Sequence, residues 1–324
     1  MRFFNAEDVR RLLPMEACIE AMAAALAALA QGRAMQPLRS IMRLPEGGGL
    51  LGMMPAFAGD LDRIGIKVIT VFPHNHGTPY DSHQGAVLLF EGRHGSPLCA
   101  VDASEVTAIR TAAVSGLATR LLAREDAGEV AILGCGVQGR THLEAMRAVR
   151  PLRRVRLWSR TADSAHRLAK SGKSAGLDVV VAASAHDAVD GASVVCTTTA
   201  SSEPILEGTW LAPGCHVNAV GACFPTAREL DAAAVARSSL FVDRRESALA
   251  EAGDLLLAIG EGAVRAEHIR AELGDVLLGT HPGRTSPDEI TLFESLGIGV
   301  EDVAAAELVY RNGTRSDDDD ATAG

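Results

Sequence analysis

The spacing of hydrophobic and polar residues changes once along this chain. An apolar stretch over residues 15–31, with Pro14 before it and Gly32 after it, predicts one helix. Short apolar runs then predict strands over 37–44, 50–57, 64–72, 85–91 and 97–101, the last two joined as a hairpin. The first hundred residues therefore predict a helix with an antiparallel sheet.

A second pattern begins near residue 129, after a helix predicted from about 102 to 124. Strands at 130–133, 155–158, 179–181, 194–198, 216–220 and 240–242 come with helical stretches between the first four of them. Such alternation is typical of βαβ units and a parallel sheet. We therefore predict an α/β chain with a Rossmann-type dinucleotide-binding domain over 121–290. A mixed α+β domain would combine residues 1–120 with 291–314, which include a final helix predicted near 301–311, and 315–324 would be a disordered acidic tail.

Composition narrows the range of partners. The chain of 324 residues is 47% hydrophobic and carries a net charge of -10. Nucleic-acid binding through phosphates favours the opposite sign, so we expect neither nucleic acid nor a membrane as a partner. None of the six cysteines forms a C-x-x-C pair and no secretion signal is visible, so we expect reduced thiols in the cytoplasm and no metal site.

The strongest motif is a glycine-rich loop that follows a strand and opens a helix. It holds Gly134, Gly136 and Gly139, with Val137 and Gln138 between the last two. The first glycine allows a tight turn, the second lets a pyrophosphate approach the backbone, and the third allows close packing of helix on strand. The N–H groups and dipole at the helix start favour phosphate, so we predict a dinucleotide cofactor here.

The residues at the end of the next strand indicate which dinucleotide binds. Enzymes that use NAD usually carry Asp or Glu there for the ribose 2′-hydroxyl, but this chain has Ser159, Arg160 and Thr161. A guanidinium suits a 2′-phosphate, so NADP(H) is preferred over NAD(H). Because ligands bind beyond the carboxyl ends of such strands, we place the nicotinamide near further strand ends. These are Thr198, Thr199, Ala200, Asn218, Val220 and Gly221.

Several longer stretches resemble the ornithine cyclodeaminase/mu-crystallin family. They are GIKVITVFPHN (65–75), DSHQGAVLLFEG (81–92), TAIRTAAVSGLAT (107–119), AILGCGVQGRTHLEAM (131–146), NAVG with REL (218–230), EAGD (251–254) and GRTSPDEITLF (283–293). The resemblance covers nearly the whole chain. It implies a homodimer built by the non-Rossmann domain, which also binds substrate, a nicotinamide cofactor, and small α-amino or α-imino acids as substrates.

Two cations stand in apolar surroundings. Arg110 lies within a predicted helix among Ala, Thr, Ile and Val, and if buried it needs an anion: either a substrate carboxylate or a protein carboxylate in a structural ion pair. Lys67 lies in an apolar strand, where alternation alone could turn it to solvent. The resemblance implies instead that both contact substrate. Lys67 would bind the carboxylate or donate a proton near the imine nitrogen.

Three further residues follow from the resemblance. Arg39 matches a second carboxylate-binding arginine, with the nearby Arg43 as the alternative match. Ser82 and His83 match a turn expected near the substrate, although His83 is nearly as well explained as a structural histidine.

One departure from the family pattern bears on the reaction. Cyclodeaminases carry a catalytic aspartate where this chain has Cys223, and a neutral thiol is a poor carboxylate substitute. The ketimine reductases of the family also lack that acid, although Cys223 could equally be a small packing residue. We therefore predict NADPH-dependent reduction of Δ1-pyrroline-2-carboxylate or Δ1-piperideine-2-carboxylate, to proline or pipecolate. The alternatives are an ornithine or lysine cyclodeaminase, an NAD(P)-dependent amino-acid dehydrogenase, and an NADPH-dependent ligand-binding protein.

Overall fold

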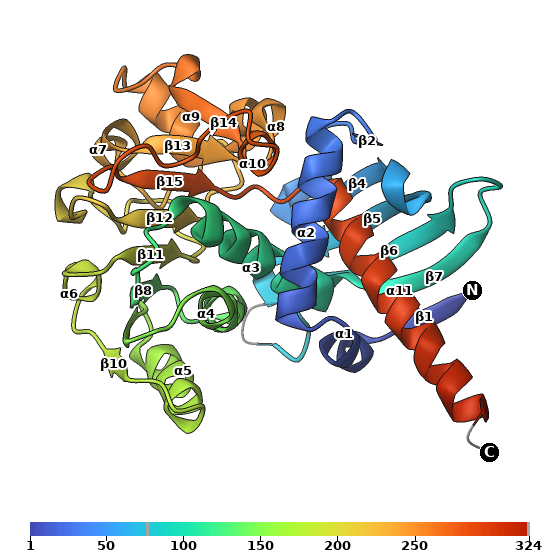
Figure 1. Ribbon diagram of the computed structural model, residues 1–324. Coiled ribbons are helices and arrows are strands. Elements are labelled where there is room, and N and C mark those ends of the chain that lie inside the picture. The colour runs from blue at the N-terminus through green and yellow to red at the C-terminus, as the bar shows by residue number, and fades with distance from the viewer. Residues whose placement is uncertain (76–77, 323–324) are drawn as a thin grey trace. The chain divides into compact units, whose positions relative to one another are not determined.

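The chain folds into two units. The computed structural model describes residues 1–75 and 78–322, with all of their side chains except those of Glu46 and residues 316–322. Unit 1 consists of Met1–Arg110 and Gly297–Gly324, and unit 2 consists of Thr111–Leu296. The predicted fold class is confirmed: unit 1 is mixed α+β and unit 2 is a parallel α/β sheet (Figure 1).

Unit 1 is built on one mixed sheet with the strand order β1-β7-β6-β5-β4-β2, and β3 pairs with β4. Its strands are β1 (Arg2–Phe4), β2 (Ala34–Met35), β3 (Ser40–Arg43), β4 (Leu50–Ala58), β5 (Arg63–Val71), β6 (His83–Glu91) and β7 (Pro97–Asp102). Its helices are α1 (Ala6–Leu12), α2 (Met15–Ala30) and α11 (Gly299–Thr322), with the 3-10 turns η1 (Pro45–Gly47), η2 (Gly59–Leu61) and η3 (Pro73–Asn75). The predicted antiparallel sheet is present, and β1, which the sequence analysis missed, joins β7 in parallel.

Helix α11 packs on β4 and β5 and against α2 (Figure 1). It is longer than the predicted helix near 301–311, because its later turns are also held: Asn312 Nδ2 donates to Leu12 O at 2.8 Å, and Gly313 lies against the Phe4 ring. The helical backbone continues to Thr322, through most of the segment predicted as a disordered tail. Residues 323–324 of that segment lie outside the described residues.

Unit 2 is a parallel sheet with the strand order β10-β9-β8-β11-β12-β15-β13-β14. Its strands are β8 (Glu129–Leu133), β9 (Arg154–Trp158), β10 (Val179–Val181), β11 (Val194–Thr197), β12 (His216–Ala219), β13 (Ser239–Val242), β14 (Ile269–Glu272) and β15 (Thr291–Glu294). Its helices are α4 (Val137–Val149), α5 (Ala162–Ser174), α6 (Ala185–Val189), α7 (Ala232–Arg237), α8 (Arg245–Glu251), α9 (Gly253–Gly260) and α10 (Leu273–Leu277), with η4 (Gly208–Trp210) and η5 (Ala266–His268). The chain order reverses between β8 and β11, the arrangement that creates a ligand crevice at the strand ends.

The unit boundaries differ from the predicted ones for a physical reason. Helix α3 (Ala103–Leu122) passes the first boundary inside its own length, because Ser115 and Thr119 on its second half bond to side chains of unit 2. Strand β15 joins the parallel sheet, so the chain returns to unit 1 only at Gly297. Sequence patterns gave no strand at 291–294, which is why the predicted boundary lay at 290.

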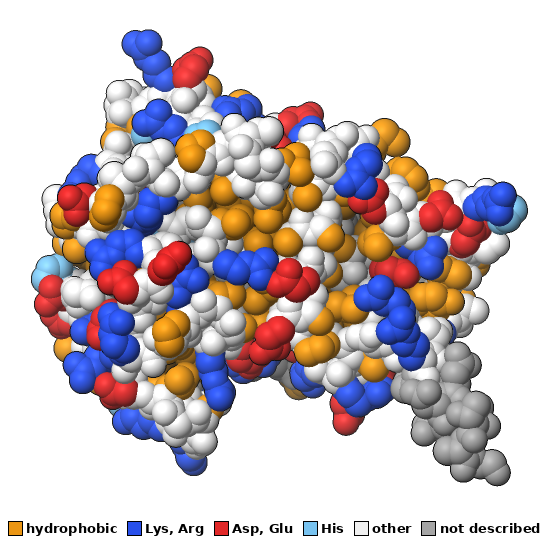
Figure 2. Space-filling view, in the orientation of Figure 1, with side chains coloured by type: hydrophobic (Ala, Val, Ile, Leu, Met, Phe, Trp, Pro, Cys, Tyr) orange, Lys and Arg blue, Asp and Glu red, His pale blue; other side chains and the backbone are white. Residues whose placement is uncertain are grey.

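The surface carries basic and acidic side chains, in agreement with the composition of the chain. Figure 2 shows basic and acidic side chains interspersed over the face in view, without a large field of one sign. In the described residues, no single helix is long and apolar enough to cross a bilayer. Helices α1 and α2 together meet the length and composition, but they bend by 84° between them.

Candidate functional site

The glycine-rich loop has the geometry of a phosphate cradle. Gly134 adopts φ 106, where a Cβ would lie 2.7 Å from Thr198 O, and a Cβ on Gly139 would lie 2.1 Å from Gly134 O. Gly136 caps α4 and a Cβ there would meet open space. A larger residue at Gly136 would therefore point into the space where a phosphate approaches the N–H groups of the first turn. These residues fit a dinucleotide, and Val137 is 61% exposed beside them.

A cavity of about 310 Å³ lies at the carboxyl ends of β9 and β10. It is lined by Trp158, Ser159, Arg160, Ala162, Ala165, Val181, Ala182 and Ala183. Ser159 and Arg160 therefore both line a cavity on the side of β8 where, in this kind of fold, the adenosine half of a dinucleotide binds. Thr161 is the N-cap residue of α5 next to them.

Most of the residues predicted near the nicotinamide do lie at the ends of β11 and β12. Thr198 Oγ1 donates to Gly134 O at 2.7 Å, which ties the β11 end to the glycine-rich loop. Ala200 is exposed, Val220 is buried and Gly221 is half-buried. Asn218 differs: it is fully buried inside β12, and its Nδ2 donates to Thr119 Oγ1 at 2.9 Å. Its side chain therefore serves the core of unit 2, because it completes a hydrogen-bond network there.

In unit 1, Lys67 is buried on the inner face of the sheet, with 2% of its surface exposed. Alternation along the strand places Lys67 on the buried face, with Gly65 and Ile69, and not toward solvent. Its Nζ donates to Asp302 Oδ1 at 3.0 Å and to Thr107 Oγ1 at 3.2 Å. Burial and the nearby Arg110 charge lower the pKa of Lys67 to about 8, although Asp302 opposes that shift.

Arg110 lies beside Lys67 and is 3% exposed. Its Nε donates to Asp302 Oδ1 at 2.9 Å and its Nη1 donates to Glu301 Oε2 at 3.0 Å. The structure therefore contains the ion pair with protein carboxylates that was one of the two explanations for a buried arginine. These bonds also fix the orientation of the guanidinium. Burial alone would raise the pKa of Asp302, but Arg110 and Lys67 hold it below its usual value.

Arg39, rather than Arg43, joins this cluster. Its Nη2 donates to Gly297 O at 3.0 Å, and its charge helps to lower the pKa of Lys67. Ser82 Oγ and His83 Nδ1 are 3.0 Å apart at the start of β6. Partial desolvation and the charge of Lys67 lower the pKa of His83, so its ring lies within electrostatic reach of the cluster.

Glu301 and Asp302 are the members that sequence reasoning missed. Both lie in the first turn of α11, where the helix dipole favours carboxylates, and both are fully buried. The available signal was two adjacent acids opening an apolar helical run, together with two buried cations that needed counter-ions. The cluster thus contains three basic residues, Lys67, Arg110 and Arg39, and these two acids.

Cys223 is half-buried and packs against the core of unit 2. It lies near Glu294, a carboxyl group with 1% exposure at the end of β15. Burial raises the pKa of Glu294 well above its usual value, and the neighbouring Asp254 and Glu229 raise it further. The protonated form of Glu294 is therefore favoured more than in an exposed glutamate.

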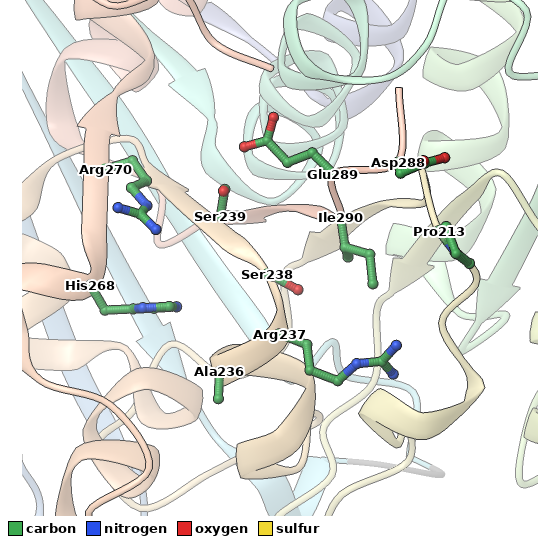
Figure 3. Close-up of a pocket in the computed structure, with 10 residues that line it drawn as sticks. All are labelled: Pro213, Ala236, Arg237, Ser238, Ser239, His268, Arg270, Asp288, Glu289 and Ile290. Atoms are coloured by element: carbon green, nitrogen blue, oxygen red, sulfur yellow. The ribbon is translucent and has the colours of Figure 1, made fainter. Parts of the chain in front are cut away.

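A larger cavity, of about 510 Å³, lies at the opposite edge of the parallel sheet, where β13, β14 and β15 begin. Figure 3 shows residues from these three strand starts around it, Arg270 and His268 among them. Several of its polar groups already have partners in unit 2: Ser238 Oγ donates to Ala234 O at 2.7 Å, and His268 Nε2 lies 2.9 Å from Val235 O. This cavity is remote from the glycine-rich loop, which lies at the carboxyl ends of the strands.

Comparison with known proteins now tests the resemblance. A model of the ornithine cyclodeaminase/mu-crystallin family matches residues 2–317. The chain belongs to this family. The ketimine reductase mu-crystallin of Mus musculus is 40% identical over 312 residues, which cover 95% of this chain and 96% of the mouse protein. This relationship confirms the family predicted from the sequence.

Two solved structures have the same fold as this chain. One is Δ1-pyrroline-2-carboxylate reductase of Thermococcus litoralis, in complex with NADH and L-proline. It has a TM-score of 0.95 and 33% identity, and the match covers 98% of each chain. The other is an archaeal alanine dehydrogenase dimer with bound NAD, with a TM-score of 0.93 and 30% identity, covering 98% of this chain and 97% of that one.

Proposed function

We propose that this protein reduces a small cyclic ketimine, Δ1-pyrroline-2-carboxylate or Δ1-piperideine-2-carboxylate, to proline or pipecolate. The imine, one hydride and one proton give the cyclic amine, with NADPH converted to NADP⁺. The observation that carries the proposal is the cluster of the buried Lys67 and Arg110 with the half-buried Arg39, in a chain that also has a dinucleotide-binding fold. The relatives named ketimine reductase and Δ1-pyrroline-2-carboxylate reductase support the substrate class.

The charge of the cluster suits a monoanionic substrate. It brings three basic side chains close together, and a substrate carboxylate would be attracted to them. Glu301 and Asp302 hold Arg110 in place before substrate arrives, so little ordering is left for the binding step. Arg39 and Lys67 would complete the clamp, with Ser82 and His83 at its border.

Lys67 is the proposed proton donor. Its pKa of about 8 keeps it largely protonated at neutral pH while leaving the proton easy to transfer. Asp302 and Thr107 hold the amine from two sides and fix where the proton is presented. A protonated C=N group accepts hydride more readily, and the bound nicotinamide would supply that hydride.

The proposed preference for NADPH rests on Arg160. This exposed guanidinium lines the cavity beside β9, where an NAD enzyme would carry an acid. The two structural relatives carry NADH and NAD, so NADH is the alternative reductant. Separate affinities for NADPH and NADH test this part of the proposal.

Cys223 and Glu294 favour reduction over cyclodeamination. Cyclodeamination needs a base near the substrate amine, and a neutral thiol does not provide one. Glu294 lies near Cys223, and its raised pKa favours the protonated form, which cannot act as the base. We therefore propose that the imine itself is the substrate.

We also propose a homodimer formed through unit 1. The outer face of its sheet carries Met53, Pro55, Ile66, Val68 and Leu88, which are half-buried and lie side by side in the strand register. Ile64 on the same face is 42% exposed. An apolar sheet face of this kind suits a second copy of the chain. Light scattering of the wild type against Ile66→Lys would show a dimer becoming a monomer.

Paired assays on the purified protein test the proposed reaction. One follows NADPH or NADH oxidation with each of the two imines. The other follows ammonia release from L-ornithine and L-lysine with catalytic NAD⁺ or NADP⁺. Rapid imine reduction without ammonia release is the expected result. Ammonia release would establish a cyclodeaminase, and cofactor binding without turnover in either assay would indicate a ligand-binding protein.

A further inference from the structure

Two of the family-like motifs have no role in the site described so far. They contribute Glu229, within REL, and Asp254, within EAGD. Both side chains are fully buried inside unit 2. A buried carboxylate is costly unless hydrogen bonds satisfy it, so their partners indicate what they do.

Glu229 joins the ends of two neighbouring strands. Its Oε1 accepts bonds from Thr199 N and Thr199 Oγ1, both at 2.6 Å, and its Oε2 accepts one from Gly221 N at 2.7 Å. Thr199 follows β11 and Gly221 follows β12. A Cβ on Gly221 would lie 1.9 Å from Thr199 O, so the two segments are in close contact.

Asp254 fixes the backbone at Glu229. Its Oδ1 accepts bonds from Glu229 N and Leu230 N, each at 2.8 Å. The preceding Gly253 donates from its N to Ala222 O at 2.9 Å, in the loop that carries Cys223. A Cβ on Gly253 would lie 1.8 Å from Ala227 O. The start of α9 is therefore pressed against this loop.

We propose that Glu229 is a positioning residue for the nicotinamide half of the cofactor, with Asp254 holding it in place. The strand order reverses between β8 and β11, so the adenosine half would lie toward β9 and the nicotinamide half toward β11 and β12. Glu229 fixes the backbone at those two strand ends. This inference rests on the proposed cofactor site of unit 2, and it does not depend on the imine substrate.

The hydrogen bonds favour a group with two acceptor oxygens at this position. Glu229 accepts from three donors on two segments, and a carboxylate offers acceptors on both oxygens. In Glu229→Gln the shape is kept, but one oxygen becomes an NH2 group that faces a donor. Either Thr199 or Gly221 then loses its anchor.

The test compares Glu229→Gln with the wild type, using Glu144→Gln as the matched control. Glu144 is an exposed residue of α4 that pairs with Arg140 at 3.2 Å. Calorimetry gives the affinity for NADPH and for 2′,5′-ADP, which lacks nicotinamide. We expect NADPH to bind Glu229→Gln about ten- to hundredfold more weakly, while 2′,5′-ADP binds within about twofold of the wild type. The enhancement of nicotinamide fluorescence on binding should also fall, and the control should match the wild type.

Two outcomes would overturn the inference. One is unchanged NADPH affinity and fluorescence in Glu229→Gln. The other is an equal loss of affinity for both ligands, which would mean a general structural role in unit 2. If Glu229→Gln does not fold, Thr199→Val removes one of the three bonds and should show a smaller effect in the same direction. Failure of imine reduction by the wild type would overturn the proposed function without changing these binding measurements.

Discussion

Each unit buries carboxyl groups, but the two units stabilise them with different partners. In unit 1, Glu301 and Asp302 pair with Arg110 and Lys67 at 2.9–3.0 Å. In unit 2, Glu229 and Asp254 accept bonds mainly from backbone N–H groups, and burial raises the pKa of Glu294. The first arrangement holds buried charges of both signs against one another. The second fixes backbone segments without offering a charge to a ligand.

The difference shows that a buried acid is not by itself a sign of catalysis. A carboxylate paired with cations sets the charge and pKa of its partners, so changing it should alter chemistry and pH dependence. A carboxylate bonded to backbone N–H groups sets geometry, so changing it should alter the fit of a ligand. A protonated carboxyl group should tolerate a neutral isostere.

The largest expected effect comes from Arg110→Ala. The change removes a proposed substrate contact and leaves two buried acids without one of their cations. We expect kcat/KM for the imine to fall about hundredfold or more, and the free energy of unfolding to fall by about 3–5 kcal/mol. Steady-state kinetics and urea denaturation measure the two effects. Arg120→Ala, an exposed position on the same helix, is the control, and normal kcat/KM in Arg110→Ala would disprove the proposed clamp.

Asp302→Asn should produce the next largest effect, seen in the pH profile of kcat. The protonated form of Lys67 exists below its pKa, so wild-type kcat should fall as pH rises above about 8. Asp302 raises the pKa of Lys67, and its neutral replacement should move this alkaline limb to lower pH. An unmoved limb in Asp302→Asn would show that another group donates the proton.

Arg160→Ala, in unit 2, should weaken the use of NADPH more than the use of NADH. Loss of one charge-assisted contact to a 2′-phosphate should raise the KM for NADPH by about tenfold. The KM for NADH should stay within about twofold of the wild type, because NADH has no such phosphate. Kinetics with both cofactors measure the ratio, and equal changes for the two would mean that Arg160 does not read the phosphate.

Glu294→Gln should have the smallest effect at neutral pH. The raised pKa favours a protonated carboxyl group in the native state, so we expect a neutral isostere to change the free energy of unfolding by no more than about 1 kcal/mol. Because the native pKa is raised, the native state keeps a proton that the unfolded state releases, and wild-type stability should decline with rising pH through this group. Urea denaturation at several pH values should show a weaker decline in Glu294→Gln, and a large loss at neutral pH would indicate an ionised Glu294.

Local patterns were sufficient for the glycine-rich loop and most strands of both sheets. Turn geometry, helix starts and strand periodicity depend on residues close together in the chain, so Gly134, Gly136 and Gly139 could be read directly. The short strands β14 and β15 and the length of α11 were missed, because tertiary packing rather than a strong local pattern stabilises them.

Local patterns could not predict which residues pair when they are far apart in the sequence. Lys67 meets Asp302 across 235 positions, and Arg110 meets Asp302 across 192. The sequence showed that a buried arginine needs an anion, but many acids were available and only the fold brings Glu301 and Asp302 to it. The inward turn of Asn218 and the bonds of Glu229 to two strand ends arose in the same way. Residue types determine which interactions are chemically suitable, whereas packing determines which groups are close enough to form them.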